Sequence, residues 1–514
     1  MAELTTPLPR ERALALNWSK LLSFAAFLMI VVLQVLGNLY WIARNVVPIG
    51  RDAGGHLMLA LEYTQILDRL TLQSLFTALT YHDFRPPALY MATQVPYRLF
   101  GYSMDAAQMV NVALLIPILG LTFLLGRRLV GEHAGLLAVA LTAFFPMMAA
   151  MTRLFYLENF HTTMVLAVLF CLLKSEGFAS RRWAVLWGVS LGVGLLVKWA
   201  LPTFVFLPIL VAVWHSGIVR MQWESMRRPR VDLRALGVAL FAAVLLASLW
   251  YFPNRARALA LPLRDWLLVV WIVLLTVAFY ALGRPSRPLT NCWAGLFVGL
   301  SVASLWYAAR IDFVAPFIET AYGTYGGHFE AFDPRRLNNY VRYPRLFVTH
   351  HLGPLASLVL LPAGLLPWLA RRRLGDPVAA RLENAPMVAW LLWAGLLSAY
   401  LITAFSSQTG ERNIVPVLPI VALLLAGGLA RYPRRLALGF GLVWIGILAL
   451  QWSIFTFDGM APFHRATEPL WADGEFLVRP ASGATDPAYW IAPDVLSEVQ
   501  ARHDPNTAAD STLG

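Results

Sequence analysis

The polar stretch from Arg51 to Gly101 contains several side chains that could do chemistry. It follows the first long apolar run, precedes the second, and is too polar to cross a bilayer. Its titratable residues include Asp52, His56, Glu62, His82, Asp83 and Arg85. Ionisable groups beside a membrane span are functional candidates, because the bilayer makes them costly to retain. The stretch therefore indicates a reaction site at the boundary between lipid and water.

A second carboxylate, Glu158, begins the fourth apolar run at the same membrane boundary. An ion pair with Arg153 or solvation at the interface is a structural alternative to a functional role. Four cations on this side could bind a phosphate, namely Arg85, Lys198, Arg345 and Arg412. For each cation alone, binding of lipid headgroups or snorkelling explains its position equally well.

Two carboxylates with several cations suit transfer of a group from a phosphate-bearing donor. An acceptor hydroxyl needs a general base to take its proton, and Asp52 is the first candidate. A phosphate leaving group needs no general acid, but fixed cations must stabilise its growing negative charge.

Further site candidates are His56, His82, Asp83, Tyr343 and His350. The histidines on this side leave a divalent metal open, but no HExxH or similar spacing occurs, so no cofactor is firmly predicted. Walker A, Rossmann and GxSxG motifs are also missing from the sequence contexts that they require. Cys171 and Cys292 lie inside apolar runs, which is typical of buried apolar packing.

Surface helices must position the first candidates. Residues 53–70 place apolar and small side chains at helical spacing, which predicts a helix lying on the membrane surface. Pro86 and Pro87 can open a second such helix. Asp52 then stands at the N-cap of the first helix, so capping of backbone N–H groups is an alternative to catalysis.

The composition indicates a polytopic membrane protein. Of the 514 residues, 58% are hydrophobic and 14% are charged, against about 25% charged in soluble proteins. Hydropathy predicts an all-α integral membrane bundle of about 13 spans, at residues 20–43, 104–126, 133–151, 157–174, 183–198, 200–216, 233–251, 266–283, 291–309, 352–370, 386–405, 413–430 and 436–456. The division between the fifth and sixth spans is the least distinct, because only Lys198 and Pro202 separate them.

Charge predicts the orientation. With the N-terminus in the cytoplasm, the inner segments carry about +14 and the outer segments about −2, which together give the net charge of +12. The basic excess is therefore topological and argues against nucleic-acid binding. We expect a multi-pass protein of the plasma (inner) membrane, with the site and the C-terminus outside.

The expected domain organisation has two parts. A transmembrane module covers residues 1–456, with long outer loops at 44–103 and 310–351. A short outer tail covers 457–514, with one brief helix expected at 494–502.

Several motifs, in this order, carry a family resemblance. They are Asp52 after the first span, RPPALYMATQVPYRLFG, RLFYLENFHTTMVLAVLFCLL, GLLVKWALPTFVFLPIL and ERNIVPVLPIVALLLAGG. The chain resembles integral-membrane glycosyltransferases of the GT-C class, in the branch of the protein O-mannosyltransferases and the lipid A aminoarabinose transferases. The resemblance covers residues of about 20–430.

The resemblance implies roles for individual residues. Asp52 would be the catalytic base, Glu158 the second site acid, and Lys198 and Arg412 neighbours of the donor phosphate. The donor would be a polyprenyl-phosphate sugar used on the outer face of the membrane, beside membrane lipids. The first loop has Arg-Asp-Ala where mannosyltransferases have an Asp-Glu pair, so the sugar is open, and the short tail leaves the acceptor open.

Two other classes of function remain alternatives. A transporter or flippase for a lipid-linked sugar would place ionisable groups at mid-bilayer and show repeat symmetry. The predicted spans instead have nearly uncharged interiors, and the acids gather at the outer boundary. A structural subunit of an envelope-polymer assembly would not need Asp52.

Overall fold

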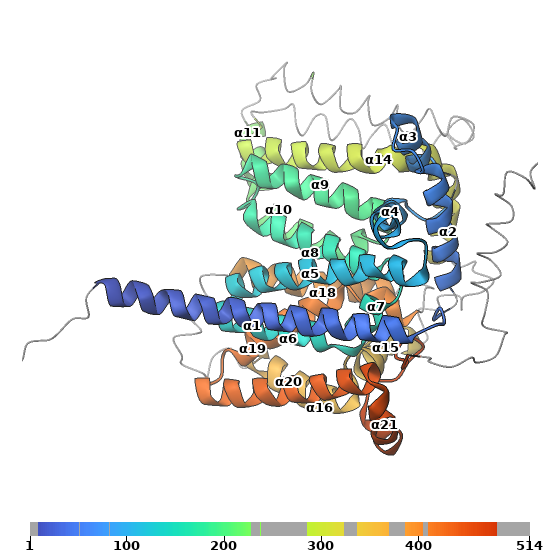
Figure 1. Cartoon of the computed structure of the whole chain (residues 1–514). Helices are drawn as coiled ribbons and strands as arrows, with labels where there is room; N and C mark the ends of the chain where they lie inside the picture. Colours follow the sequence, from blue (N-terminus) through green and yellow to red (C-terminus); the bar gives the residue numbers. More distant parts are fainter. Residues whose placement is uncertain are drawn as a thin grey trace, which may run out of the picture.

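The computed structural model describes residues 9–50, 52–81, 83–227, 237, 285–322, 337–369, 386–404 and 410–480. Within these ranges the chain is helical, with no strand. Long helices run side by side in one bundle, and short helices lie across one of its ends (Figure 1). The all-α integral membrane fold expected from the sequence is confirmed.

Five helices are long and apolar enough to cross a membrane. These segments are Lys20–Arg44 within α1 (Pro9–Arg44), α5 (Met104–Leu129), Arg287–Tyr307 within α14 (Arg287–Tyr322), Met387–Ala404 within α18 (Pro386–Ala404), and α20 (Arg434–Thr456). Their exposed leucines and valines face outward, as lipid-facing side chains do. The protein therefore crosses the membrane several times.

Three further pairs of helices meet the same test together but are bent. They are α6 (Glu132–Phe144) with α7 (Pro146–Arg153) at 62°, α10 (Pro202–His215) with α11 (Ile218–Met226) at 51°, and 340–352 with 354–368 at 110°. The last pair contains α15 (Leu337–Leu346), the π-helical turn η1 (Phe347–Leu352) and α16 (Pro354–Leu369). Each break coincides with a proline or a glycine with positive φ, as these residues interrupt helical hydrogen bonding.

The remaining apolar segments are shorter helices. They are α8 (Glu158–Lys174), α9 (Arg181–Val197) and α19 (Val417–Leu429), the last preceded by the 3-10 turn η2 (Glu411–Ile414). The expected break near Lys198 is present, because α9 ends at Val197, Lys198 is extended, and α10 begins at Pro202. The expected spans at 233–251 and 266–283 lie outside the described residues, as does the tail helix expected at 494–502.

The second long outer segment differs from the expected loop. Helix α14 continues to Tyr322, and α15 with η1 occupies 337–352, so much of 310–351 is helical. Residues 323–336 of this segment lie outside the described residues. Helix α14 projects past its apolar part, and Arg310 Nε donates to the carbonyl oxygen of Tyr81 at 3.1 Å in the first loop.

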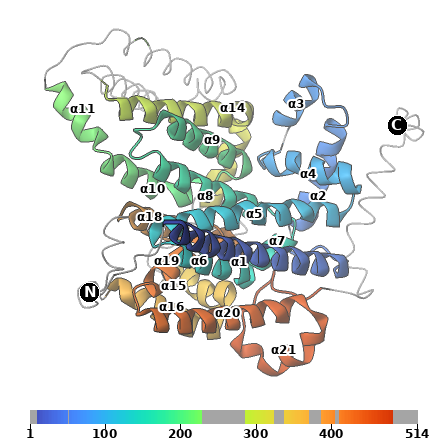
Figure 2. The same ribbon diagram turned by 60° about the vertical axis from the view of Figure 1, so that its left-hand side comes forward.

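The first outer loop folds into three helices at one end of the bundle. They are α2 (Ala53–Ile66), α3 (Leu72–Leu79) and α4 (Ala88–Phe100), so both expected surface helices are present (Figure 1). They form their own apolar cluster around Tyr63 and Tyr90, which joins the bundle through α5. Figure 2 shows the same end with α21 (Ala461–Thr467) of the tail below it.

The tail between α20 and residue 480 returns to the bundle. It contains η3 (Asp458–Met460), α21, η4 (Glu468–Leu470) and the extended residues 471–480. Arg44 at the end of α1 lies 3.7 Å from the carboxylate of Asp458, which places the start of the tail at the end of the bundle where the first loop lies.

Candidate functional site

Asp52 immediately precedes α2 and its side chain is 56% exposed. It occupies the N-cap position, but its carboxylate makes no capping hydrogen bond. The carboxylate instead accepts a hydrogen bond from the guanidinium of Arg412. Helix capping therefore does not occupy this carboxylate, and Asp52 joins the first loop to the segment before α19.

Arg412 lies on η2, and its guanidinium contacts both carboxylates of the site. Its Nη2 donates to Asp52, and its Nε lies 3.7 Å from Oε1 of Glu158. The guanidinium carbon is 4.5 Å from the centre of the Tyr156 ring. Burial lowers the pKa of Arg412, but the charges of Glu158 and Asp52 outweigh burial and raise it, so the group stays charged.

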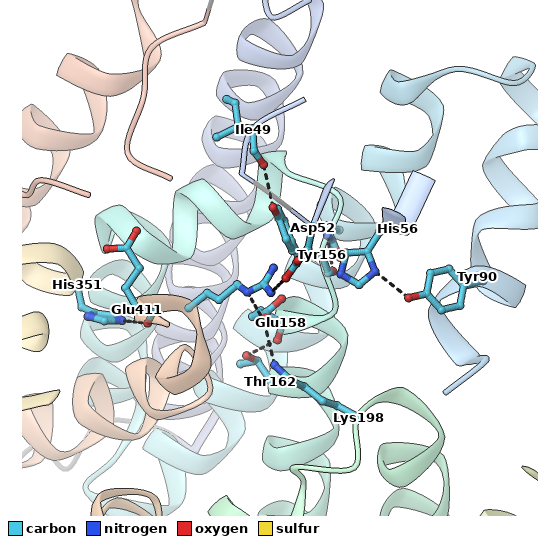
Figure 3. Close-up of polar contacts among 12 residues, drawn as sticks. Ile49, Asp52, His56, Tyr90, Tyr156, Glu158, Thr162, Lys198, His351 and Glu411 are labelled. Atoms are coloured by element: carbon cyan, nitrogen blue, oxygen red, sulfur yellow. Dashed lines mark hydrogen bonds and ion pairs between the residues drawn. The ribbon is translucent and has the colours of Figure 1, made fainter. Parts of the chain in front are cut away.

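Glu158 begins α8 and is buried, with 2% of its side chain exposed. Lys198 Nζ lies 3.0 Å from Oε1, the same oxygen that faces Arg412 (Figure 3). A buried carboxylate is stable only when it is paired, and here two cations share one oxygen. The suggested partner, Arg153, instead donates to the carbonyl oxygen of Phe455 at 3.1 Å and packs over Trp41.

His56 lies one helical turn after Asp52 and is buried. Its Nδ1 lies 2.7 Å from the hydroxyl of Tyr90, and its ring packs edge-on against Tyr156 (Figure 3). Burial and the charge of Arg412 lower its pKa to about 3, so His56 is neutral at pH 7. It therefore adds no charge to the site, where the carboxylates of Asp52 and Glu158 balance the charges of Arg412 and Lys198.

Arg85 lies near this group from the turn before α4. Its Nε and Nη2 each lie 3.0 Å from an oxygen of Asp83, as a bidentate pair. A Cβ built on Gly55 of α2 would lie 3.0 Å from Nη1 of Arg85, which places the arginine against the helix that Asp52 precedes. Arg85 and Asp83 are thus near the site, although Arg85 is already paired.

Three other candidates lie on α15 and η1. Tyr343 and Arg345 are on α15, the first buried and the second exposed. His350 lies on η1, and its Nε2 is 3.2 Å from Oε2 of Glu411, the neighbour of Arg412. His82 lies outside the described residues. The structure thus brings Asp52, Glu158, Lys198 and Arg412 into one contact series, and His350 lies beside this series through its contact with Glu411.

Sequence reasoning missed three side chains beside this series. Tyr156 packs under Arg412 and donates its hydroxyl to the carbonyl oxygen of Ile49 at 2.9 Å. Glu411 is buried beside His350, and Phe476 of the tail lies 6.0 Å from the Arg412 guanidinium carbon. Tyr156 lies two residues before Glu158, so its position in the sequence could have suggested a role, whereas no spacing connects Phe476 to the site.

A metal site is not formed by the described side chains. In that part of the chain, no group of three or more His, Cys, Asp or Glu side chains is arranged to hold a metal ion.

Residues 84–246 match the family described as dolichyl-phosphate-mannose-protein mannosyltransferase. The match covers about a third of the 514 residues and includes Glu158 and Lys198. No curated protein matches the chain by sequence. The match to this family confirms the resemblance to GT-C glycosyltransferases that the ordered motifs indicate.

Solved structures of two kinds are similar to this chain. ArnT from Cupriavidus metallidurans in the apo state is 18% identical over 85% of this chain and 64% of its own, with a TM-score of 0.47. The same protein bound to undecaprenyl phosphate gives 17% identity over 85% and 68% of the two chains, with a TM-score of 0.47. Archaeal oligosaccharyltransferase AglB from Archaeoglobus fulgidus, with an inhibitory peptide and a dolichol-phosphate, gives 16% over 90% and 61%, with a TM-score of 0.44. The chain thus spans about two thirds of the length of these proteins.

The helical bundle, the site at its end and the family match together define a class. The chain is a multi-pass membrane protein that resembles GT-C glycosyltransferases.

Proposed function

We propose that this chain is an inverting glycosyltransferase. It moves a sugar from a polyprenyl-phosphate donor to an acceptor hydroxyl group on the outer face of the membrane. The observation that carries the proposal is the contact series Asp52, Arg412, Glu158 and Lys198, in which an exposed carboxylate and two cations meet above a buried carboxylate. The matching family supports this, since its description names a dolichyl-phosphate sugar as donor.

The two carboxylates have different surroundings and therefore different roles. Glu158 is buried between two cations, so it holds them in place and has no access to an acceptor. Asp52 is half exposed, so an incoming hydroxyl can reach it. We assign proton removal to Asp52 and the orientation of Lys198 and Arg412 to Glu158.

Donor binding would change the partner of Arg412. In the structure, Arg412 is paired with Asp52, so this carboxylate is occupied by a cation. A phosphate is a strong bidentate partner for a guanidinium and would compete with Asp52 for it. Asp52 is then released beside the sugar, so the base becomes effective only when the donor is present.

The reaction then needs one proton transfer and one displacement. The acceptor oxygen attacks the anomeric carbon from the face opposite the phosphate, and its proton passes to Asp52. The bond from the anomeric carbon to the phosphate oxygen breaks, and its electron pair leaves with the polyprenyl phosphate. Arg412 and Lys198 stabilise the added charge on the leaving group, so no acid is needed, in contrast to glycoside hydrolysis.

The substitution Asp52→Asn tests the assignment. It keeps the size of the side chain but cannot take a proton, so transfer should fall by at least about 10²-fold, as when a general base is removed. Donor binding and membrane insertion should stay normal. Asp68→Asn, an exposed carboxylate in the same loop, serves as the control and should transfer normally.

The product must be identified before rates are compared. Mass spectrometry of envelope lipids, glycans and proteins, with and without the protein, reveals the added sugar and its acceptor. The purified protein is then assayed with that polyprenyl-phosphate sugar. Full transfer activity of Asp52→Asn would rule out the proposed base.

A further inference from the structure

The extended tail residues 471–479 lie against the bundle and form a segment that we call the strap. Four of its side chains are buried, namely Trp471, Ala472, Phe476 and Leu477. Exposed chain ends rarely bury so many side chains without a specific contact surface. The strap is therefore an ordered part of the structure.

Hydrogen bonds tie the strap to several elements in turn. The N–H of Ala472 donates to Gln451 Oε1 of α20 at 2.9 Å, and the N–H of Asp473 donates to the Thr349 carbonyl of η1 at 3.1 Å. Further along, Trp41 Nε1 of α1 donates to the Val478 carbonyl at 3.2 Å. These bonds fix the path of the backbone on both sides of Phe476.

Phe476 is the strap residue that reaches the site. Its ring lies edge-on to Tyr156, with ring centres 5.5 Å apart, and 6.0 Å from the guanidinium carbon of Arg412. The guanidinium of Arg412, which pairs with Asp52, therefore contacts two aromatic rings, those of Tyr156 and Phe476. Such contacts restrict the orientation of a guanidinium and favour its charged form.

The same ring also contacts the segment that carries Asp52. A Cβ built on Gly50 would lie 2.7 Å from Cε1 of Phe476, and Gly50 has a φ of +84°, a conformation that side chains disfavour. Glycine at this position lets the chain pass close to Phe476 and Tyr156, two residues before Asp52. Phe476 thus packs on Arg412 and lies beside Gly50, two residues before Asp52.

The backbone beside Phe476 is held by the neighbour of Arg412. The Phe476 N–H lies 3.4 Å from Oε1 of Glu411, and Glu411 Oε2 lies 3.2 Å from Nε2 of His350. Position 411 therefore holds the strap while position 412 contacts its ring. The strap and the turn η2, which carries Arg412, therefore pack together as one unit.

We infer that Phe476 is a positioning residue of the site, through which the strap orients Arg412 toward Asp52 and the donor phosphate. The inference rests on the proposed function for the role of Arg412. It assigns part of the site to a segment far from the motifs that carry the family resemblance.

Binding of undecaprenyl phosphate to the purified full chain in nanodiscs tests the inference. Phe476→Leu should weaken binding by about 3- to 10-fold, the range for a lost cation–π contact. Phe476→Tyr keeps the ring and should bind normally. Phe24→Leu, which changes an exposed aromatic residue on α1, is the matched control and should bind normally.

A double substitution separates positioning from general damage. In an Arg412→Ala background, Phe476→Leu should change binding by less than about twofold, because the contact is already gone. An equal loss in both backgrounds would show that Phe476 acts on stability alone, and unchanged binding of Phe476→Leu would show no role. Either result would overturn the inference.

Hydrogen–deuterium exchange tests, without any donor, whether Phe476 orders the segments around Asp52 and Arg412. Phe476→Leu should speed exchange at 49–58 and 410–416 but leave α5 unchanged, and Phe24→Leu should change neither segment. If the unchanged protein does not bind undecaprenyl phosphate, the proposed function fails, and exchange decides whether Phe476 orders these segments. Unchanged exchange at both would then reject the inference.

Discussion

Arg412 is the side chain through which the two carboxylates of the site are linked. Its guanidinium pairs with exposed Asp52 on one side and faces buried Glu158 on the other. A planar group with five donors can hold two such partners and still change one of them. This geometry explains how one arginine could serve both the donor phosphate and the base.

Arg412→Ala should weaken donor binding by about 10- to 100-fold, because it removes a charge-assisted contact from a partly buried site. Acceptor preference should change far less, because the acceptor approaches from the side of Asp52. Titration of the lipid donor and competition between acceptors measure the two effects. Arg465→Ala, an exposed arginine on α21, is the control. Unchanged donor affinity of Arg412→Ala would contradict the assignment.

Glu411 predicts a pH dependence of stability. Burial raises the pKa of this carboxyl from 4.5 to about 7, and the protonated group can donate to Nε2 of His350. Between these values the folded state holds a proton that the unfolded state has lost, so the free energy of unfolding falls as pH rises through this window. The fall should be on the order of 2–3 kcal/mol.

Thermal unfolding in detergent from pH 4.5 to 8 measures whether stability falls as the pH rises. The Tm of the unchanged protein should decline toward pH 7 relative to Glu411→Gln, which keeps an acceptor for Phe476 but does not titrate. Glu468→Gln, at an exposed carboxylate of the tail, should leave the decline intact. Parallel Tm curves for the unchanged protein and Glu411→Gln would refute the assignment.

At the scale of residues, the sequence identified the charged members of the site but not their aromatic neighbours. Asp52 follows an apolar run, and Glu158 and Lys198 lie at the ends of such runs, where an ionised group is costly and therefore conspicuous. Phe476 lies among other tail aromatics, so only the fold shows that it packs on Arg412. The sequence also did not indicate that Asp52 pairs with Arg412, because the two residues are 360 positions apart.

Helices α9 and α14 pack along a seam of glycines, and α9 leads directly to Lys198. Gly188 and Gly192 of α9 face Gly295 and Gly299 of α14. A Cβ on Gly192 would lie 2.6 Å from the Gly299 carbonyl oxygen, and a Cβ on Gly299 would lie 2.8 Å from that of Gly188. Two G-x-x-x-G pairs thus let the backbones approach closely, as in other membrane helices.

Gly188→Ala should force α9 away from α14 and destabilise the protein by about 1–3 kcal/mol, the usual cost of overpacking. Donor binding should also weaken, because Lys198 follows α9. Gly120→Ala in α5, where an added Cβ meets no atom within 4 Å, is the matched control and should be neutral or slightly stabilising. Equal changes of Tm in Gly188→Ala and Gly120→Ala would contradict the close packing of α9 on α14 through these glycines.

At the scale of elements, hydropathy located the helices but not their bends. The apolar run at 133–151 was predicted as one span, whereas α6 and α7 meet at 62°. The span predicted at 352–370 agrees with α16, but the helical segment before it, at 340–352, and the 110° bend between the two were not predicted. Hydropathy averages over about 20 residues and does not register a local change of direction. Pro146 marks the first bend and Gly353 the second, so these two residues were the sequence signals for a change of direction. The G-x-x-x-G pairs were also readable in the sequence.

The whole molecule has two chemically different ends. The first loop and the tail gather at one end, whereas α5, α8 and α20 have basic residues at their opposite ends, namely Arg127, Arg128, Lys174, Arg434 and Arg435. Basic residues favour the cytoplasmic side. The arrangement supports the orientation proposed for the site.

Cysteine labelling tests this orientation in intact cells. In a background lacking Cys171 and Cys292, Gln73→Cys on α3 should react with a membrane-impermeant thiol reagent. Arg435→Cys on α20 should react only after permeabilisation. Both positions are exposed, so access depends on the side of the membrane alone. The reverse pattern would place the site in the cytoplasm.

The strap also sets an order of events during biosynthesis. Residues 471–479 leave the ribosome after every described helix has been made, and under the proposed topology they must cross the membrane before Phe476 can meet Arg412. A nascent or stalled chain would hold Asp52, Glu158 and Lys198 without this last contact. Donor binding would then reach its full strength only after translocation is finished, so partly made chains would consume less of the lipid-linked sugar pool.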